Sequence, residues 1–193
     1  MEYECPICQC AAISNPVGGR DILDIECLRC RKYIITGTAA AMLDGKSISM
    51  DDRLLLSMWM FENQGVELDS EHIKNFPIVD MPSLHERACN LIREFARRNP
   101  SMGDEVELDF VSKHIEPTAT RISRDEYANL NPKDQEKVKA LFEWMSISRC
   151  KNSSELIFLL VDYMTDDLGW LKDWTVTGVT ISPSGWINLE EQK

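Results

Sequence analysis

The spacing of apolar residues predicts two amphipathic helices in the middle of the chain. Over residues 51–63 and again over 83–98, apolar side chains recur every three or four positions, which places them on one face of a helix. Each stretch follows a serine that lies three residues before a carboxylate, a spacing typical of a helix N-cap. The capping pairs are Ser49 with Asp52 and Ser83 with Glu86. The predicted buried faces contain Leu54, Leu55, Met58 and Phe61, and then Leu84, Ala88, Leu91, Ile92 and Phe95.

The last third of the chain has the pattern of three helices followed by short strands. Ser123 with Glu126 caps a short helix, Asn131 begins a second, and residues 153–169 form a third that is apolar on almost all sides. Two strand-like pieces and a final segment follow, "WLKDW" at 170–174, "GVTIS" at 178–182 and "PSGWINLEE" at 183–191. The whole chain is therefore expected to be α+β and mostly helical.

Composition favours a folded protein with excess negative charge. Hydrophobic residues make up 44% of the 193 residues, enough to bury a core, and the formal net charge is -11. Acidic residues outnumber basic ones in each of the segments 1–50, 51–115 and 116–193. Proteins that hold a phosphate backbone normally present a cationic face, so this charge argues against nucleic acid as the main partner.

The N-terminus does not have the pattern of an export signal. Its first residues are acidic and include cysteines, whereas a signal peptide needs a positive start and a long apolar stretch. The longest clear apolar run, "LIFLLV" at 156–161, is far shorter than a membrane span. We therefore expect a soluble cytosolic protein, whose seven cysteines serve as thiols or metal ligands and not as a disulfide framework.

Four cysteines near the N-terminus have the spacing of a zinc site. Cys5 with Cys8 and Cys27 with Cys30 form two C-x2-C pairs separated by 18 residues. A two-residue gap lets both sulfurs of a pair face one ion, and four thiolates at about 2.3 Å complete a tetrahedron around Zn²⁺. Such a site has no open position for water, so it stabilises a fold. A redox role for one pair is the alternative, but two matched pairs favour metal.

Residues 3–37 resemble a zinc ribbon. The resemblance is carried by "CPIC" and "CLRC" and by two strand-like segments beside the second pair, "DILDIEC" at 21–27 and "RKYIITG" at 31–37. It implies a structural zinc ion. The functions of zinc ribbons range from nucleic-acid contact to protein docking, so the resemblance does not name an activity.

Cys10 and three cations flank the predicted ligands. We interpret Cys10 as a small half-buried residue, with replacement of Cys8 as a ligand or a redox role as alternatives. Arg29, Arg31 and Lys32, within "CLRCRK", are the best candidates for contacts to nucleic acid. The favoured interpretation is that these cations offset the charge of four thiolates around one divalent ion.

Residues 120–191 resemble a winged-helix module through the order helix, helix, hairpin and the closing "TISPSGW". A module of this kind that reads DNA presents polar and basic side chains from the helix before the hairpin. Between Ser154 and Leu168 there is no Lys or Arg, so packing or protein contact is favoured for this module. A zinc ribbon followed by helices and such an ending is also similar to modules of uncharacterised bacterial proteins.

The residues available for catalysis do not form a recognisable set. His85 and Cys89 lie four positions apart in the 83–98 helix, as a base and a cysteine nucleophile would. The sequence supplies no third group to orient them, so ordinary packing is favoured. His72 and His114 lie in segments without a defined pattern. We therefore predict that the protein is not an enzyme.

These patterns predict three regions, a zinc ribbon over 1–37, a helical middle region over 38–115 and a winged-helix-like region over 116–193. The predicted function is a non-enzymatic zinc-containing interaction or sensor module in a larger bacterial system, with a protein partner or self-association and no membrane. The alternative is a transcriptional regulator that binds nucleic acid through the basic second C-x2-C pair. Three tryptophans near the hairpin are expected in the core, with a partner interface as the alternative: Trp170, Trp174 and Trp186.

Overall fold

Two compact units make up the chain, and each combines two stretches of sequence. Unit 1 contains Met1–Met81 with Arg121–Pro132, and unit 2 contains Pro82–Thr120 with Lys133–Lys193. The structure is a computed structural model that describes residues 2–45, 48–76, 81–98, 101, 105–107, 120–152, 154–175 and 178–191. It is mixed α+β and 53% helical, which confirms the predicted fold class at this level. Across the described residues, every helix is too short or too polar to cross a bilayer.

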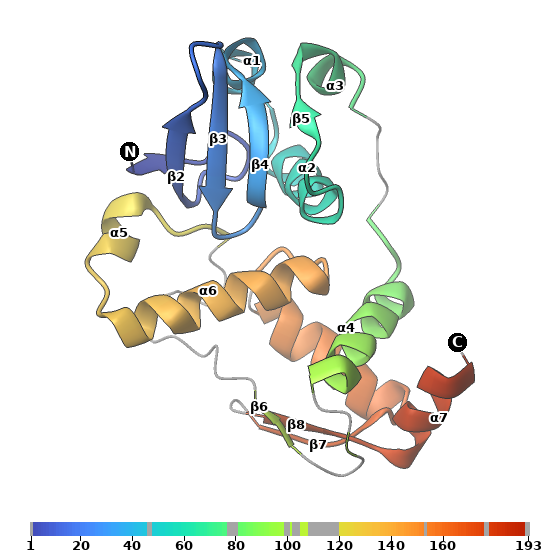
Figure 1. The fold of residues 1–193 in the computed structure, drawn as a ribbon. Coiled ribbons are helices and arrows are strands. Elements are labelled where there is room, and N and C mark those ends of the chain that lie inside the picture. The colour runs from blue at the N-terminus through green and yellow to red at the C-terminus, as the bar shows by residue number, and fades with distance from the viewer. Residues whose placement is uncertain are drawn as a thin grey trace. The chain divides into compact units, whose positions relative to one another are not determined.

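A five-stranded sheet forms the centre of unit 1 (Figure 1). Four strands pair antiparallel in chain order, β1 (Glu2–Glu4), β2 (Ala11–Pro16), β3 (Ile22–Cys27) and β4 (Arg31–Thr36). Strands β3 and β4 confirm the two strands predicted beside the second cysteine pair. The fifth strand, β5 (Glu67–Leu68), pairs parallel with β4, so the N-terminal sheet extends beyond residue 37.

Four helices accompany this sheet, α1 (Gly37–Gly45), α2 (Met50–Glu62), α3 (Ser70–Lys74) and α5 (Arg124–Ala128). Helix α2 confirms the helix predicted over 51–63. The Asp52 amide donates a hydrogen bond to Ser49 Oγ at 3.1 Å, which satisfies one of the free N–H groups at the helix start. The predicted capping box of α5 also forms, between Ser123 and Glu126.

Helix α5 belongs to unit 1 although it is far away along the chain. It lies beside β1 and β2 (Figure 1). The Ala11 amide donates to the Ile122 carbonyl at 3.0 Å, and Ile122 is buried. A short segment that sequence spacing assigns to the C-terminal third therefore completes the N-terminal unit.

The core of unit 1 lies where α1 and α2 pack against β4. Alternate residues of the strands are buried, Ile25 and Cys27 in β3 and Tyr33 and Ile35 in β4, because successive side chains of a strand point to opposite faces. The helices add side chains that are almost fully buried: Ala39, Leu43, Leu54 and Met60.

Unit 2 is mainly helical. Its helices are α4 (Leu84–Arg98), α6 (Pro132–Ile147) and α7 (Pro183–Glu191), together with a helix in two parts, η1 (Glu155–Val161) and η2 (Tyr163–Asp167), that has π-type hydrogen bonding. The helices predicted over 83–98 and from Asn131 are confirmed. The third predicted helix is also present, but its π-type pattern was not expected because apolar spacing does not distinguish the two kinds of helix.

A three-stranded antiparallel sheet completes unit 2, in the order β6 (Glu105–Glu107), β8 (Gly178–Ile181) and β7 (Leu171–Thr175). Strands β7 and β8 form the predicted hairpin. Helix α7 begins directly after it, and a Cβ on Gly185 would lie 2.4 Å from the Trp170 carbonyl oxygen. Glycine is therefore required where the final helix approaches the chain that leads into the hairpin.

Candidate metal centre

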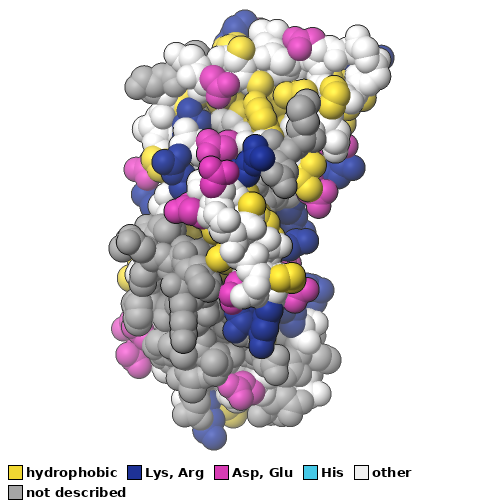
Figure 2. Space-filling view, turned by 90° about the vertical axis from the view of Figure 1, so that its left-hand side faces the viewer, with side chains coloured by type: hydrophobic (Ala, Val, Ile, Leu, Met, Phe, Trp, Pro, Cys, Tyr) yellow, Lys and Arg dark blue, Asp and Glu magenta, His cyan; other side chains and the backbone are white. Residues whose placement is uncertain are grey.

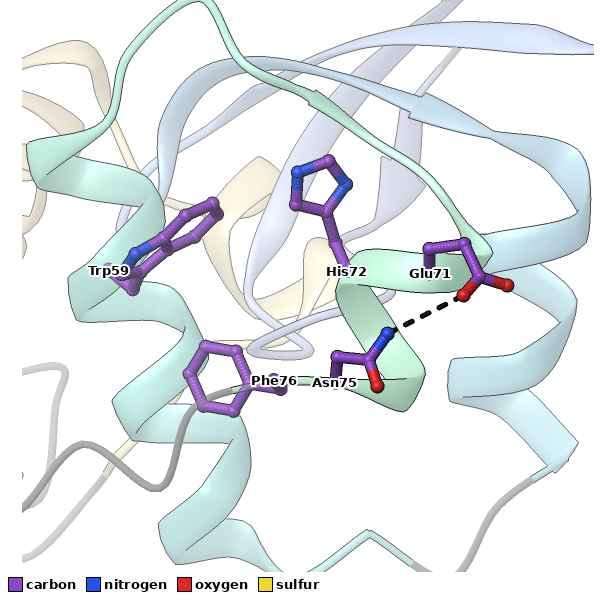
Figure 3. Close-up of a pocket in the computed structure, with 5 residues that line it drawn as sticks. All are labelled: Trp59, Glu71, His72, Asn75 and Phe76. Atoms are coloured by element: carbon purple, nitrogen blue, oxygen red, sulfur yellow. Dashed lines mark hydrogen bonds between the residues drawn. The ribbon is translucent and has the colours of Figure 1, made fainter.

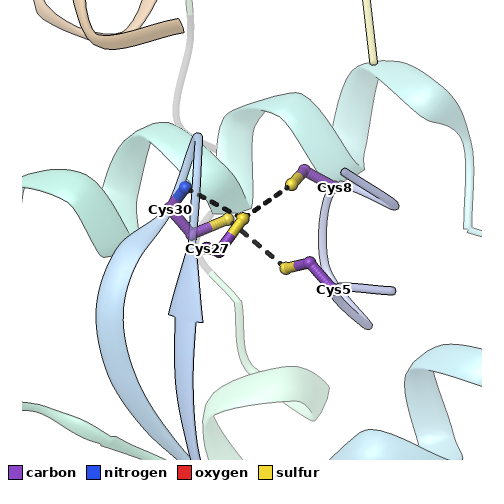
Figure 4. A group of neighbouring side chains, drawn as sticks. All are labelled: Cys5, Cys8, Cys27 and Cys30. Carbon is purple, nitrogen blue, oxygen red and sulfur yellow. Dashed lines mark hydrogen bonds between the residues drawn. The ribbon is translucent and has the colours of Figure 1, made fainter. Parts of the chain in front are cut away.

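Two turns at the same end of the unit 1 sheet bring the four predicted ligands together (Figure 4). Cys5 and Cys8 lie in the turn between β1 and β2, and Cys27 and Cys30 lie at the turn between β3 and β4. Because β2 and β3 run antiparallel, both turns fall at the same end of the sheet. The sheet topology therefore converts two sequence motifs into one site.

The four sulfurs have the separations of a single coordination sphere. All four Sγ atoms lie within 4.8 Å of one another. Cys5 Sγ and Cys30 Sγ are 3.7 Å apart, and Cys8 Sγ and Cys27 Sγ are 3.4 Å apart. A tetrahedron with metal–sulfur distances of about 2.3 Å has sulfurs about 3.8 Å apart. All seven cysteines of the chain are free thiols, so these contacts are not disulfides.

The two turns share an unusual backbone conformation. Gln9 follows Cys8 and has a φ of 59°, and Arg31 follows Cys30 and has a φ of 61°. A non-glycine residue rarely adopts this left-handed conformation, which is unfavourable by about 1–2 kcal/mol. Its occurrence at the same position after both C-x2-C pairs indicates that each turn is shaped to direct two sulfurs toward one point.

Hydrogen-bond donors surround the sulfurs. The amides of Arg29 and Cys30 each donate to Cys27 Sγ at 3.4 Å. The Tyr33 hydroxyl lies 3.0 Å from Cys5 Sγ and can also donate, whereas the Cys30 thiol donates to the Ser57 hydroxyl oxygen at 3.2 Å. Donors of this kind stabilise thiolates and orient metal ligands.

Burial disfavours ionisation of three of these four thiols. The exposed fractions of the four cysteines are between 0 and 5%. Burial raises the pKa of Cys8, Cys27 and Cys30 well above the usual range for a thiol. Burial also acts to raise the pKa of Cys5, but hydrogen bonds from the other three thiols and Tyr33 outweigh it and hold the pKa well below the usual range. A divalent cation at the centre is what would allow all four to ionise.

Arg53 in α2 fixes the first turn, and the sequence analysis missed it. Its buried guanidinium donates to the carbonyls of Pro6 at 2.8 Å, Ile7 at 3.2 Å and Leu43 at 2.9 Å. A signal was present, because Arg53, Ser57 and Met60 have the i, i+4, i+7 spacing of one helix face and all three are buried. Because Arg53 is charged, a search for apolar spacing did not identify it as a buried residue that anchors the first turn.

The three predicted nucleic-acid contacts have different surroundings. Arg29 is fully buried and does not face solvent, which removes the access that a phosphate contact needs. Arg31 is exposed, with its guanidinium carbon 4.2 Å from the centre of the Phe61 ring. Lys32 is also exposed and pairs with Asp24 at 3.3 Å. A role in nucleic-acid binding stays a prediction for Arg31 and Lys32.

Cys10 is fully buried, in contrast to the half-buried position expected. It lies outside the group of four sulfurs, and its carbonyl oxygen accepts a hydrogen bond from the Cys5 amide at 2.9 Å. The hydrogen bond from Cys8 lowers its pKa more than burial raises it. Because Cys8 Sγ belongs to the group of four sulfurs and Cys10 Sγ does not, Cys8 is favoured over Cys10 as the ligand in the first turn.

His72 and His85 each pack against a tryptophan ring and are not members of the four-cysteine group. The His85 ring packs against Trp170 with ring centroids 5.4 Å apart, and the His72 ring packs against Trp59 at 6.1 Å. His114 falls outside the described residues. Within the described residues, the four cysteines are the one group of three or more His, Cys, Asp or Glu side chains that could hold a metal ion.

Comparison with known proteins adds no family to this description. No family model, curated protein or solved structure matches the chain. The four-cysteine group and the fold around it are therefore the basis for a functional proposal.

Proposed function

We propose that Cys5, Cys8, Cys27 and Cys30 bind one Zn²⁺ ion in a zinc ribbon and that this ion stabilises unit 1. The observation that carries the proposal is the group of four buried sulfurs within 4.8 Å of one another. A tetrahedron of thiolates suits Zn²⁺, which has no geometric preference of its own. Four thiolates leave no coordination position open, so the ion has a structural role.

The protein as a whole is proposed to be a non-enzymatic interaction or sensor module in the cytosol. A closed metal site and a net charge of -11 support binding to a protein, or to a second copy, over binding to a polyanion. Similarity of the sequence pattern to bacterial zinc-ribbon modules supports a place in a larger bacterial system.

A winged-helix-like ending is part of this proposal. Its support is the order of elements in unit 2, which is α4, β6, α6, the η1–η2 helix and the β7–β8 hairpin, with β6 beside β8. The bounds expected from the sequence, 116–193, include α5, which belongs to unit 1. The helix before the hairpin pairs Glu155 with Arg87 and exposes Asp166 and Asp167, which supports packing or protein contact over contact with DNA.

The nucleic-acid alternative has less support. Arg31 and Lys32 interact with side chains of their own unit, Phe61 and Asp24. Figure 2 shows positive and negative side chains of the described residues next to each other at several places on the face in view.

The test of this functional assignment is binding to a mixed pool of DNA and RNA at increasing salt. We expect no salt-dependent binding between about 50 mM and about 200 mM salt. A protein that does not neutralise phosphates releases no counterions from the nucleic acid. The double variant Arg31→Ala/Lys32→Ala is expected to behave like the unchanged protein. Salt-dependent binding that this variant loses would establish the alternative and overturn the interaction-module assignment.

A further inference from the structure

Three aromatic rings surround a pocket on unit 1, away from the cysteines. Trp59 comes from α2, His72 from α3, and Phe76 follows α3 by two residues. Glu71 and Asn75 complete the lining of the pocket, whose volume is about 260 Å³. Figure 3 shows the Trp59 and Phe76 rings on the side of α3 that faces α2, and Glu71 at the opposite edge of α3, joined to Asn75 by a hydrogen bond.

The rings are arranged around a space and are not stacked on each other. The Trp59 and His72 ring centroids are 6.1 Å apart at 42°, and those of Trp59 and Phe76 are 6.3 Å apart at 84°. The His72 ring is held in place, because its Nδ1 lies 2.8 Å from Asp69 Oδ1 in the N-terminal capping box of α3. One wall of the pocket, the His72 ring, is therefore positioned before any ligand arrives.

The surroundings of the pocket favour a cation. The carboxylate that lines the pocket is Glu71, whose Oε1 pairs with Lys74 Nζ at 2.7 Å and whose Oε2 accepts a hydrogen bond from Asn75 at 3.4 Å. The faces of aromatic rings are themselves negative, so rings and carboxylate attract the same kind of ligand.

The exposure of the pocket rim suits a group that enters from solvent. Glu71, His72 and Asn75 are exposed, whereas Trp59 and Phe76 are half-buried and form the inner wall. An apolar body with a diffuse positive charge matches this combination better than a neutral apolar group or a compact hydrated cation. Methylated ammonium groups have that character, because methyl groups replace the N–H donors that water would otherwise bind.

We propose that the pocket formed by Trp59, Glu71, His72, Asn75 and Phe76 binds a quaternary ammonium group. Its source is either a trimethylated lysine of a partner protein or a small quaternary amine, and the recognition chemistry is the same. This inference goes beyond the proposed function by naming a ligand, and it needs a folded unit 1 but not a particular metal.

The first experiment compares a cation with a neutral molecule of the same shape, on protein whose metal content has been measured. Choline is expected to bind with a Kd of about 1 mM, and 3,3-dimethylbutan-1-ol, in which carbon replaces the charged nitrogen, is expected to bind at least about tenfold more weakly. A peptide with trimethyllysine, compared with the same peptide carrying unmodified lysine, tests the protein source. Equal binding of choline and its neutral isostere, or no binding of choline and the methylated peptide, would overturn the proposal.

Paired variants test the walls and the charge of the pocket. Trp59→Leu is expected to abolish measurable binding, and Trp59→Phe to weaken it about threefold while retaining a ring. Because Trp59 also contributes to packing, two exposed side chains provide a second test. Glu71→Gln is expected to weaken choline binding about threefold, and Lys74→Gln to strengthen it about twofold by removing the competing cation.

The matched control is Glu67→Gln, which removes an exposed carboxylate in the same unit that does not line the pocket. It is expected to leave the Kd within about 1.5-fold. Identical effects of Glu67→Gln and Glu71→Gln, or unchanged binding in Lys74→Gln, would contradict the assigned site. If protein without metal binds choline, unit 1 folds without zinc, which contradicts the zinc proposal alone. If zinc-loaded protein does not bind choline, the pocket proposal alone is contradicted.

Discussion

Replacement of Cys27 by serine is expected to abolish stoichiometric zinc binding and to unfold at least the first forty residues. Cys27 Sγ lies 3.4 Å from Cys8 Sγ and accepts two backbone amides, so the change removes a ligand and the centre of a hydrogen-bonded turn. Structural zinc contributes about 10–16 kcal/mol of binding free energy in small units, whereas whole domains are stable by about 5–15 kcal/mol. The measurements are zinc content and limited proteolysis.

Cys10→Ser is the matched control for this experiment, because Cys10 is equally buried and lies beside the site but outside the four-sulfur group. We expect the Cys10 variant to retain one zinc ion per chain and a protected N-terminal region. Unchanged proteolysis in the Cys27 variant would contradict a stabilising role for the metal. Loss of zinc from the Cys10 variant together with its retention in Cys8→Ser would instead show that Cys10 is a ligand.

Replacement of Arg87 by alanine is expected to destabilise unit 2 by about 3–5 kcal/mol, the usual effect of removing one partner from a buried ion pair. The Arg87 guanidinium is buried and donates to Glu155 Oε1 at 2.9 Å, to the Ser148 carbonyl at 3.2 Å and to Cys150 Sγ at 3.1 Å. Without it, three acceptors lose a donor and a largely buried carboxylate loses its counter-charge. Hydrogen exchange of the α4 and η1–η2 amides measures the change for this unit separately.

Two further variants separate the ion pair from general effects on α4. Arg93→Ala removes an exposed arginine of the same helix and is expected to change stability by no more than about 0.5 kcal/mol. Arg87→Met combined with Glu155→Leu removes both charges and is expected to recover much of the lost stability. Equal effects of Arg87→Ala and Arg93→Ala on exchange would show that the buried network does not stabilise unit 2.

Features with a local cause were predictable from the sequence. The helix starts at Ser49, Ser83 and Ser123 were correct because a capping box depends on residues three positions apart. The four metal-ligand candidates were found for the same reason, since C-x2-C spacing fixes the geometry of each turn. Their meeting at one end of the sheet also required β2 and β3 to pair as neighbours, and the sequence analysis did not predict β2.

Features that depend on distant contacts were not predictable. The contacts of Arg53 and Arg87 are made with partners that lie far away along the chain, so the sequence does not show what either arginine anchors. The same holds for β5 beside β4 and for α5 beside β1. The aromatic pocket combines a residue of α2 with residues of and after α3, and only the packing of these helices reveals it.

The most direct test of the central claim is X-ray absorption at the zinc edge, with elemental analysis, on freshly purified protein. We predict one zinc ion per chain with four sulfur neighbours at about 2.3 Å and no nitrogen or oxygen ligand. Protein that is folded and free of metal, or a bound ion with fewer than four sulfur ligands, would contradict the account.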